Sequence, residues 1–251
     1  MQTFTIITGS SQGLGQALVE SLLTPGNRVL GMARHWNAGL QDRAQAGGAA
    51  LEQWRVDLAH PAEAAARLEA LLDTIDVTVL NSATLINNAA LIPDIAPLTQ
   101  VPALAIAQAL RVGLEAPMLL TAAFLRASAR WSIPRRVLNI SSGLGRRPMA
   151  SQATYCALKA GLDHFTRCLS LEQQGVANPA RVCALAPGVI ATRMQDQMRA
   201  TAPQDFPDRA AFVALHESGA LQTPQLAASK VLAFLQRPDF GTQPVADIRE
   251  P

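Results

Sequence analysis

Residues 3–15 read TFTIITGSSQGLG, an apolar run rich in β-branched residues that passes directly into a glycine-rich turn. The run predicts a buried strand from Phe4 to Thr8, and leucines at every fourth position from Leu14 to Leu22 predict a helix after the turn. Glycines permit the tight turn, and the helix N-terminus offers free N–H groups and a partial positive charge. This unit predicts an anion site, such as a pyrophosphate site, at Gly9, Ser10, Ser11, Gln12, Gly13, Leu14 and Gly15. The glycines alone also fit a turn that serves packing only.

The same alternation of short β-branched runs and helical periodicity continues along the chain, which indicates βαβ units and a parallel sheet. We therefore predict an α/β fold, a doubly wound (Rossmann-type) sheet of about seven parallel strands with helices on both faces. Residues 101–130 and 154–171 are long, apolar helical stretches, and 73–83 is expected to be a connection unless 77–80 form a strand. The expected strands are Phe4–Thr8, Arg28–Ala33, Trp54–Asp57, Thr84–Asn87, Arg136–Ser141, Arg181–Ala186 and a short one near Thr242–Val245.

Composition and charge restrict the possible functions. With 251 residues, 49% of them hydrophobic and 16% charged, the chain is expected to form a single domain over 1–251 rather than a disordered protein. The two long helical stretches hold more Ala and Leu than one buried stripe needs, which predicts a homodimer or homotetramer. The net charge of +2 is spread without a basic run, so we expect no nucleic-acid partner.

Three cysteines occur without a C-x-x-C pair, and the four histidines are dispersed, so neither a disulfide framework nor a metal site is predicted. This pattern favours a reducing, cytoplasmic location. The N-terminus lacks a basic region before its first strand. The longest apolar stretch, 117–125, is short for a membrane span, and no membrane partner is expected.

The end of the second predicted strand indicates which dinucleotide the turn would hold. Folds specific for NAD usually place an acidic residue there, whereas a basic residue accommodates the 2′-phosphate of NADP. Here Arg34 stands at that position, and the next acidic residue is Asp42. The sequence therefore predicts NADP(H), unless Arg34 is only a solvated charge at the end of a strand.

Polar residues also follow the third and fourth predicted strands. Asp57 and Leu58 come where an adenine amino group would be held, although Asp57 could instead cap the following helix. Asn87 and Asn88, followed by Ala89, would allow close approach to a ribose or would fasten neighbouring loops. Both interpretations remain open for the two amides.

Tyr155 and Lys159 are four residues apart, so on a helix their side chains share a face. A free tyrosine has a pKa of about 10, and a neighbouring ammonium favours the phenolate and lowers that pKa. We expect Tyr155 to act as a general acid or base. The spacing is common by chance, and its weight comes from Ser142 before it, from the glycine turn and from the run PGVIAT at 187–192.

In this order, these motifs make the chain resemble the short-chain dehydrogenase/reductase family over essentially its whole length. The resemblance implies that Ser142 hydrogen-bonds the substrate oxygen, Tyr155 donates a proton to it, and Lys159 lowers the tyrosine pKa and holds the nicotinamide ribose. It also implies that a segment at about 193–219 forms a substrate lid. The nicotinamide pocket would be lined by Pro187, Gly188, Val189 and Thr192.

The chain departs from the family pattern V-N-x-x-A-P, because Gly113 stands where an asparagine is usual. A glycine retains the main-chain carbonyl but loses the side chain, and it costs about 1 kcal/mol relative to alanine in a helix. The family pattern therefore does not define the helical geometry around residue 113. This departure motivates an alternative, an NADP-binding regulatory or sensor protein without turnover.

The implied activity is an NADPH-dependent reduction of a ketone or aldehyde. The stretches 83–88 and 223–242 resemble the sepiapterin reductase and benzil reductase branch, which narrows the expected substrate to a vicinal dicarbonyl or a pterin-like compound. An NADP-dependent alcohol dehydrogenase working in the oxidative direction would use the same residues.

Overall fold

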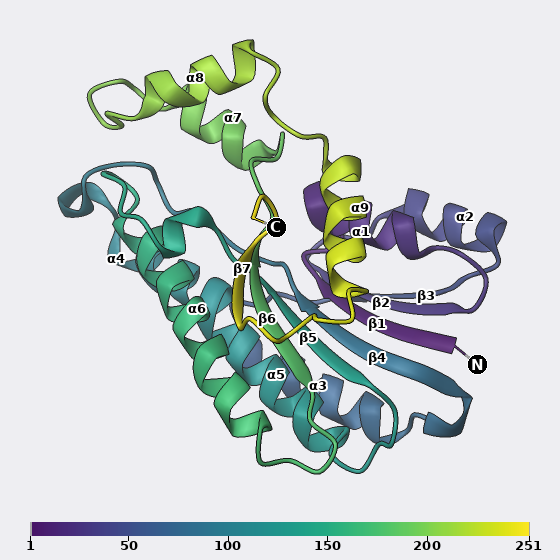
Figure 1. Cartoon of the computed structure of the whole chain (residues 1–251). Helices are drawn as coiled ribbons and strands as arrows, with labels where there is room; N and C mark the ends of the chain where they lie inside the picture. Colours follow the sequence, from purple (N-terminus) through teal and green to yellow (C-terminus); the bar gives the residue numbers. More distant parts are fainter. Residues whose placement is uncertain (1, 251) are drawn as a thin grey trace.

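The computed structural model describes residues 2–250, and its centre is one parallel sheet of seven strands in the order β3-β2-β1-β4-β5-β6-β7. Figure 1 shows this sheet between helices, so the predicted doubly wound parallel fold is confirmed. The change of direction in strand order falls between β1 and β4, where parallel α/β sheets leave a crevice at the carboxyl ends of the strands. The strands are β1 (Gln2–Thr8), β2 (Asn27–Ala33), β3 (Ala50–Arg55), β4 (Leu80–Asn87), β5 (Arg135–Ile140), β6 (Arg181–Ala186) and β7 (Val245–Asp247).

Helices cover both faces of the sheet. One face carries α1 (Gly13–Leu22), α2 (Ala38–Gly47) and α9 (Pro224–Leu235), whose apolar side chains form one core cluster with the strands. The other face carries α3 (Pro61–Asp73), α5 (Ala116–Ala127) and α6 (Ala153–Gln173), while α4 (Ala103–Leu110) precedes α5 along the chain. Each face of the sheet is thus buried, as its continuous apolar strands require.

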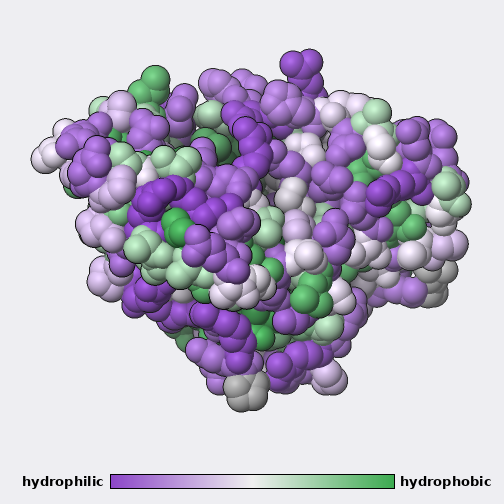
Figure 2. All heavy atoms as spheres, turned by 90° about the horizontal axis from the view of Figure 1, so that it is seen from above, coloured by the Kyte–Doolittle hydropathy of each residue, from purple (hydrophilic) through white to green (hydrophobic). Residues whose placement is uncertain are grey.

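Two short helices, α7 (Arg193–Ala200) and α8 (Arg209–Glu217), stand above the sheet and outside these two layers (Figure 1). The segment that contains them leaves and rejoins the fold at one place, because Ile190 and Gln222 form an isolated parallel bridge. There Gln222 N donates to Val189 O at 3.0 Å and Ala191 N donates to Gln222 O at 2.8 Å. Seen from above, the surface is mostly hydrophilic, with apolar residues among them near its middle (Figure 2).

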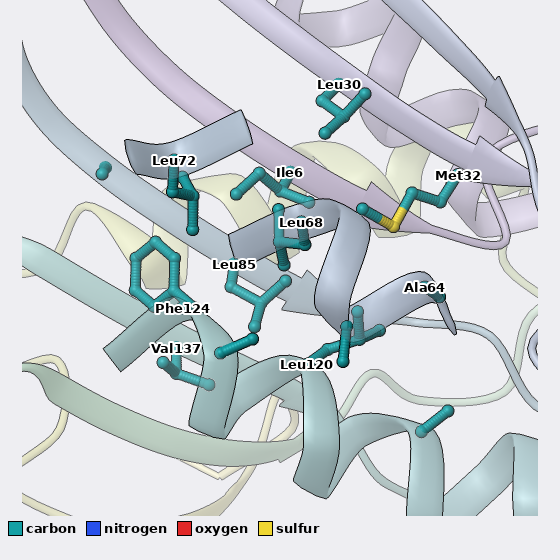
Figure 3. Close-up of a cluster of buried hydrophobic side chains, with 14 of the residues drawn as sticks. Ile6, Leu30, Met32, Ala64, Leu68, Leu72, Leu85, Leu120, Phe124 and Val137 are labelled. Atoms are coloured by element: carbon teal, nitrogen blue, oxygen red, sulfur yellow. The ribbon is translucent and has the colours of Figure 1, made fainter. Parts of the chain in front are cut away.

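The core between the sheet and the α3–α5 layer is made by side chains that the sequence pattern places on one side of each element. Figure 3 shows Ile6, Leu85 and Val137 of three neighbouring strands facing Leu68 of α3 and Phe124 of α5. All five are fully buried. Burial of such side chains is the main source of folding free energy, at about 1.5–3 kcal/mol for each.

Several boundaries differ from the sequence prediction. β3 begins at Ala50 rather than Trp54, and β7 lies at Val245–Asp247 rather than near 242–245. Residues 77–79 form a 3₁₀ turn, which leads into a β4 that begins at Leu80, well before the predicted start. The β-branched residues at 77–79 therefore form a short turn capped by Asp76, and not the separate strand that the sequence allowed at 77–80.

The predicted helical stretch 101–130 is a helix interrupted in its middle. A π-helical segment, Arg111–Glu115, separates α4 from α5 and contains Gly113. Over 103–127 the combined helix is long and apolar enough to cross a membrane by length and composition, unlike the short run expected from sequence. In the structure it packs against α3 and α6 as a helix of the globular fold.

Candidate active site

A cavity of about 720 Å³ opens at the carboxyl ends of the strands, beside the point where β1 and β4 meet. Its wall is formed by residues from the glycine turn, from the ends of the strands, from α6 and from α7 and α8. Of the residues predicted for the site, those that line it are Gly9, Ser11, Gln12, Gly13, Leu14, Gly15, Arg34, Asp57, Leu58, Asn88, Ala89, Ser142, Tyr155, Lys159, Pro187, Gly188, Val189 and Thr192.

Two residues predicted for the site, Ser10 and Asn87, do not line the cavity. Ser10 is buried, and its Oγ would lie 2.7 Å from a Cβ placed on Gly31 of β2. Its side chain therefore packs against β2, which corrects the expectation that every residue of the turn faces an anion. A serine in a glycine turn gives no sequence signal that separates these two orientations.

The glycine turn has the backbone that the sequence pattern predicts. Gly9 and Gly13 have φ angles of 68° and 57°, in the region that side chains disfavour. A Cβ on Gly15 would overlap the carbonyl of Gly9, so this glycine allows the turn and helix to pack. No side chain caps the first turn of α1, and its N–H groups remain available to an anion.

Asn87 ends β4 and Asn88 follows it, and the two side chains have different partners. Asn88 Nδ2 donates to the carbonyl of Thr8 at 2.9 Å, and Thr8 Oγ1 accepts from the backbone N–H groups of Asn88 and Ala89. Asn87 is buried and donates to Asn139 Oδ1 at 2.9 Å, away from the cavity. Asn88 thus lines the cavity and fastens the glycine turn to β4, whereas Asn87 ties two strands together.

At the far end of the cavity from Tyr155, Arg34 and His35 follow β2 and Asp57 follows β3. Asp57 Oδ1 accepts from Ala59 N at 2.9 Å, which closes a local turn. It does not cap α3, whose N-cap residue is His60. One oxygen of the Asp57 carboxylate is therefore hydrogen-bonded to the backbone of Ala59, and the side chain also lines the cavity.

Ser142, Tyr155 and Lys159 converge on the cavity wall from the loop after β5 and from α6. Tyr155 and Lys159 are 5% and 3% exposed, and the ammonium lies 5.6 Å from the centre of the phenol ring. Lys159 Nζ donates to the carbonyl of Ile140 at 2.7 Å, and the Ser142 and Tyr155 side chains are hydrogen-bonded to each other. A hydroxyl, a phenol and an ammonium therefore share one buried corner.

Burial has the largest effect on the pKa values of Tyr155 and Lys159. It raises the pKa of Tyr155 to about 12, against the opposing effect of the hydrogen bond with Ser142, and it lowers the pKa of Lys159 to about 8. The expected lowering of the Tyr155 pKa, by Lys159 together with an oxidised nicotinamide, concerns the complex with the cofactor and stays a prediction. In the protein alone, desolvation of the phenolate is the largest effect. At neutral pH the phenol keeps its proton and most of the Lys159 side chains are charged.

Above this corner, α7 and α8 bring apolar side chains to the cavity. Met194, Met198 and Phe212 line it and pack with Ile92, which follows β4. The cavity therefore has a polar end at the glycine turn and Arg34. Over Tyr155, α7 and α8 bring these apolar side chains together with polar ones, Gln195, Gln197 and Asp208. Such a division suits a ligand with charged groups at one end and a compact, largely apolar molecule at the other.

Other residues at the site were not predicted. Ile140 contributes only a backbone carbonyl, which no residue type reveals. Arg249 comes from the end of the chain, where Asp247 accepts from its backbone and guanidinium. Arg147 also lines the cavity and could have been expected from its position soon after Ser142. Within residues 2–250, no group of three or more His, Cys, Asp or Glu side chains is arranged to hold a metal ion.

Comparisons with known proteins agree with this geometry. A family model described as short chain dehydrogenase matches residues 3–203. The chain is 33% identical over 247 residues to a benzil reductase ((S)-benzoin forming) of Bacillus cereus, covering 98% of this chain and 99% of that one. A short-chain dehydrogenase/reductase from Burkholderia vietnamiensis aligns with 32% identity and a TM-score of 0.66 over 99% and 98% of the two chains. A Beutenbergia cavernae structure with bound NADP, provisionally assigned as an NAD(P)-dependent gluconate 5-dehydrogenase, aligns with 27% identity and a TM-score of 0.81 over 98% and 94%.

Proposed function

Because the chain belongs to the short-chain dehydrogenase family and is an NAD(P)-dependent oxidoreductase, we propose that it is a carbonyl reductase that uses NADPH. The observation that carries the proposal is the convergence of Ser142, Tyr155 and Lys159 on one wall of a cavity that the glycine turn also lines. This arrangement places a proton donor beside the space where a carbonyl group would lie.

The residues of the corner have separate tasks in this reaction. Ser142 donates a hydrogen bond to the substrate oxygen, and Tyr155 transfers its proton to that oxygen as the carbonyl is reduced. Lys159, held by Ile140 O, carries the positive charge beside both groups. When bound, the reduced nicotinamide supplies the hydride.

The same three residues would serve oxidation of an alcohol by NADP, with the proton passing in the opposite sense. The benzil reductases among the relatives support reduction, and we therefore place the oxidative direction second.

The residues at the polar end support NADPH as the cofactor. The positive-φ glycines and the uncapped first turn of α1 fit a pyrophosphate, and Arg34 and His35 border the cavity at the end of β2. A guanidinium can pair with a 2′-phosphate through two hydrogen bonds. Asp57, Leu58, Asn88 and Ala89 would border the adenosine, and Pro187, Gly188, Val189 and Thr192 the nicotinamide.

We assign a compact apolar substrate, a vicinal diketone or a pterin-like compound, to the space under α7 and α8. Met194, Met198 and Phe212 provide apolar contact there, and the segment 193–219 would act as the substrate lid. The name of the Bacillus cereus relative, a benzil reductase, supports an aromatic vicinal diketone. Chain 1–251 would work as a single domain.

A homodimer or homotetramer is supported by apolar side chains that the fold leaves exposed along α4 and α5. Leu104 is 66% and Met118 is 42% exposed, and both lie on the 25-residue helix 103–127. Burial of such side chains against another copy would recover hydrophobic free energy. We further propose a cytoplasmic location, supported by the free thiols of all three cysteines.

The test is reduction of benzil by NADPH, followed by loss of NADPH absorbance, with deoxybenzoin as the matched monoketone. We expect turnover of benzil and slower turnover of deoxybenzoin. Tyr155→Phe is expected to lower kcat by about 100-fold or more while NADPH still binds. Cys156→Ser, at the neighbouring position, is the control and should keep full activity. An NADPH-binding protein that reduces neither these compounds nor sepiapterin would support the sensor alternative instead.

A further inference from the structure

A buried carboxylate lies behind the catalytic corner. Asp163 follows Lys159 by four residues and Tyr155 by eight on α6, so the three side chains share one face of the helix. Asp163 is 1% exposed and does not line the cavity. One of its oxygens accepts a hydrogen bond from Ser141 Oγ.

The second oxygen of Asp163 faces the loop that follows β5. A Cβ placed on Gly145 would lie 2.8 Å from Asp163 Oδ2 and 3.0 Å from the Lys159 carbonyl oxygen, so this loop is pressed closely against α6. Among residues 2–250, no group forms a hydrogen bond with Oδ2. Asp163 therefore contacts the residue before Ser142, and it contacts the loop again three residues after Ser142.

We propose that Asp163 is a positioning residue for carbonyl reduction, which by holding Ser141 and packing on Gly145 fixes the Ser142 hydroxyl opposite Tyr155. The inference rests on the proposed reductase function. A carboxylate bears the cost of burial only when hydrogen bonds and charges compensate it. Here the compensating interactions join the loop that follows β5, residues 141–147 (the serine loop), to α6, which carries Tyr155 and Lys159.

The charges around Asp163 connect it to Lys159 as well. Burial raises the pKa of Asp163, while the Ser141 hydrogen bond and the cations of Arg146, Arg167 and Lys159 oppose that rise. Arg146 comes from the serine loop, Lys159 and Arg167 come from α6, and the Cys183 thiol faces the carboxylate from β6. In return, the Asp163 charge favours the charged form of Lys159.

Loss of Asp163 leaves other ties between β5 and α6 in place. Asn139 Nδ2 donates to Thr166 Oγ1 at 2.8 Å, and Lys159 donates to the Ile140 carbonyl at 2.7 Å. The first of these offers a matched control. Thr166→Val removes a buried hydrogen bond between the same strand and the same helix, but it does not touch the serine loop.

The experiment compares Asp163→Ala, Ser141→Ala, the double variant and Thr166→Val in benzil reduction, after thermal melts have shown that each is folded. We expect kcat to fall by about 10- to 100-fold in Asp163→Ala, as a small misplacement of a reacting group produces. Because one interaction is removed twice, the double variant should be no slower than Asp163→Ala. The affinity for NADPH, from fluorescence titration, should change by less than about threefold in all four variants, and Thr166→Val should keep its kcat.

Asp163→Asn separates the hydrogen bond from the charge. It retains an oxygen for Ser141, so kcat at mildly acidic pH should recover to within about threefold of the unaltered protein. The alkaline limb of its pH profile should move to lower pH, because Lys159 loses the favourable charge, and this limb should not move in Thr166→Val.

Wild-type kcat in Asp163→Ala, an equal loss in Thr166→Val, or additive losses in the double variant would each overturn the inference while leaving the reductase function intact. If the unaltered protein reduces no carbonyl compound with NADPH, the proposed function fails, and the inference fails with it.

Discussion

The side chain of Leu158 occupies the space into which any side chain at Gly113 would project. A Cβ on Gly113 would lie 2.9 Å from Leu158 Cδ1 and 3.2 Å from Leu158 Cδ2. Leu158 is fully buried beside Tyr155, and Gly113 is buried in the π-helical segment between α4 and α5. The glycine and the leucine are therefore complementary in size, and the interrupted helix forms without an asparagine side chain at 113.

This packing predicts that residues 113 and 158 are energetically coupled. Gly113→Ala should destabilise the protein by about 1–3 kcal/mol through overpacking, despite alanine's better helix propensity. Leu158→Ala should cost about 2–5 kcal/mol. In the double variant the alanine at 113 fills part of the cavity, so its loss, measured by urea unfolding, should be smaller than the sum. Simple additivity would show that the two side chains do not compete for space.

The single tyrosine and the two lysines of the chain, Lys159 and Lys230, allow the catalytic protonation states to be measured directly. With ¹⁵N-lysine labelling, the Lys159 resonance should titrate near pH 8, and exposed Lys230 identifies the second signal. With labelled tyrosine, the one resonance should titrate near pH 12. A Tyr155 titration below pH 10 would contradict the dominance of burial.

The same shifts predict how stability depends on pH. The pKa of Lys159 falls on folding from 10.5 to about 8, so between these values the unfolded chain binds more protons and stability should rise with pH. The pKa of Tyr155 rises on folding from 10.0 to about 12, so its contribution is present below pH 10 and is lost as pH rises through 12. The pKa of the Cys183 thiol also rises on folding, from 9.0 to about 12, so its contribution opposes that of Lys159 above pH 9. The net rise in the free energy of unfolding, measured with urea, is therefore expected from about pH 8 to 9, and it should disappear in Lys159→Met.

Arg34 should decide between the two nicotinamide cofactors. Arg34→Ser is expected to weaken binding of NADPH by about 10- to 100-fold and to leave NADH nearly unchanged, because only NADPH carries a phosphate for the guanidinium. Arg55, exposed at the end of the neighbouring strand β3 and outside the cavity, gives the control variant Arg55→Ser. Equal losses for both cofactors would argue against a 2′-phosphate contact.

The apolar side chains exposed on α4 and α5 should lie between subunits. The pair of substitutions Leu104→Asp and Met118→Asp should lower the mass measured by light scattering, since each buries a charge in the proposed contact. Leu226→Asp on α9, also at an exposed leucine, is the matched control and should leave the mass unchanged. A monomeric unaltered protein would refute the proposed assembly.

The sequence predicted the sheet because its central strands are continuous apolar runs between helical periods. It placed the start of β3 too late, since Ala50 to Gln53 lie in an edge strand that leaves several side chains exposed or half-buried. Edge strands need no apolar run, and their limits depend on pairing with a neighbour, here β2. The π-helical segment was also not predicted, although Pro117 has no N–H to donate to the carbonyl of Gly113 and is a local signal for an interrupted helix.

For the site, the sequence indicated the side chains with a conspicuous spacing, namely Ser142, Tyr155, Lys159 and the glycines, and the structure brings them to one cavity. The carbonyl of Ile140 was beyond prediction because every residue has one. Asp163 was equally hidden, since a carboxylate near the middle of a helix is usually solvated, and its burial depends on strands far away in the sequence.

The bridge between Ile190 and Gln222 pins together the two ends of the segment that holds α7 and α8. A long insertion whose ends are already joined adds little further closure entropy when its contents change. Residues 193–219 should therefore be replaceable by the corresponding segment of another family member. The replacement would change the residues that cover the cavity, while the sheet and the positions of Ser142, Tyr155 and Lys159 stay the same.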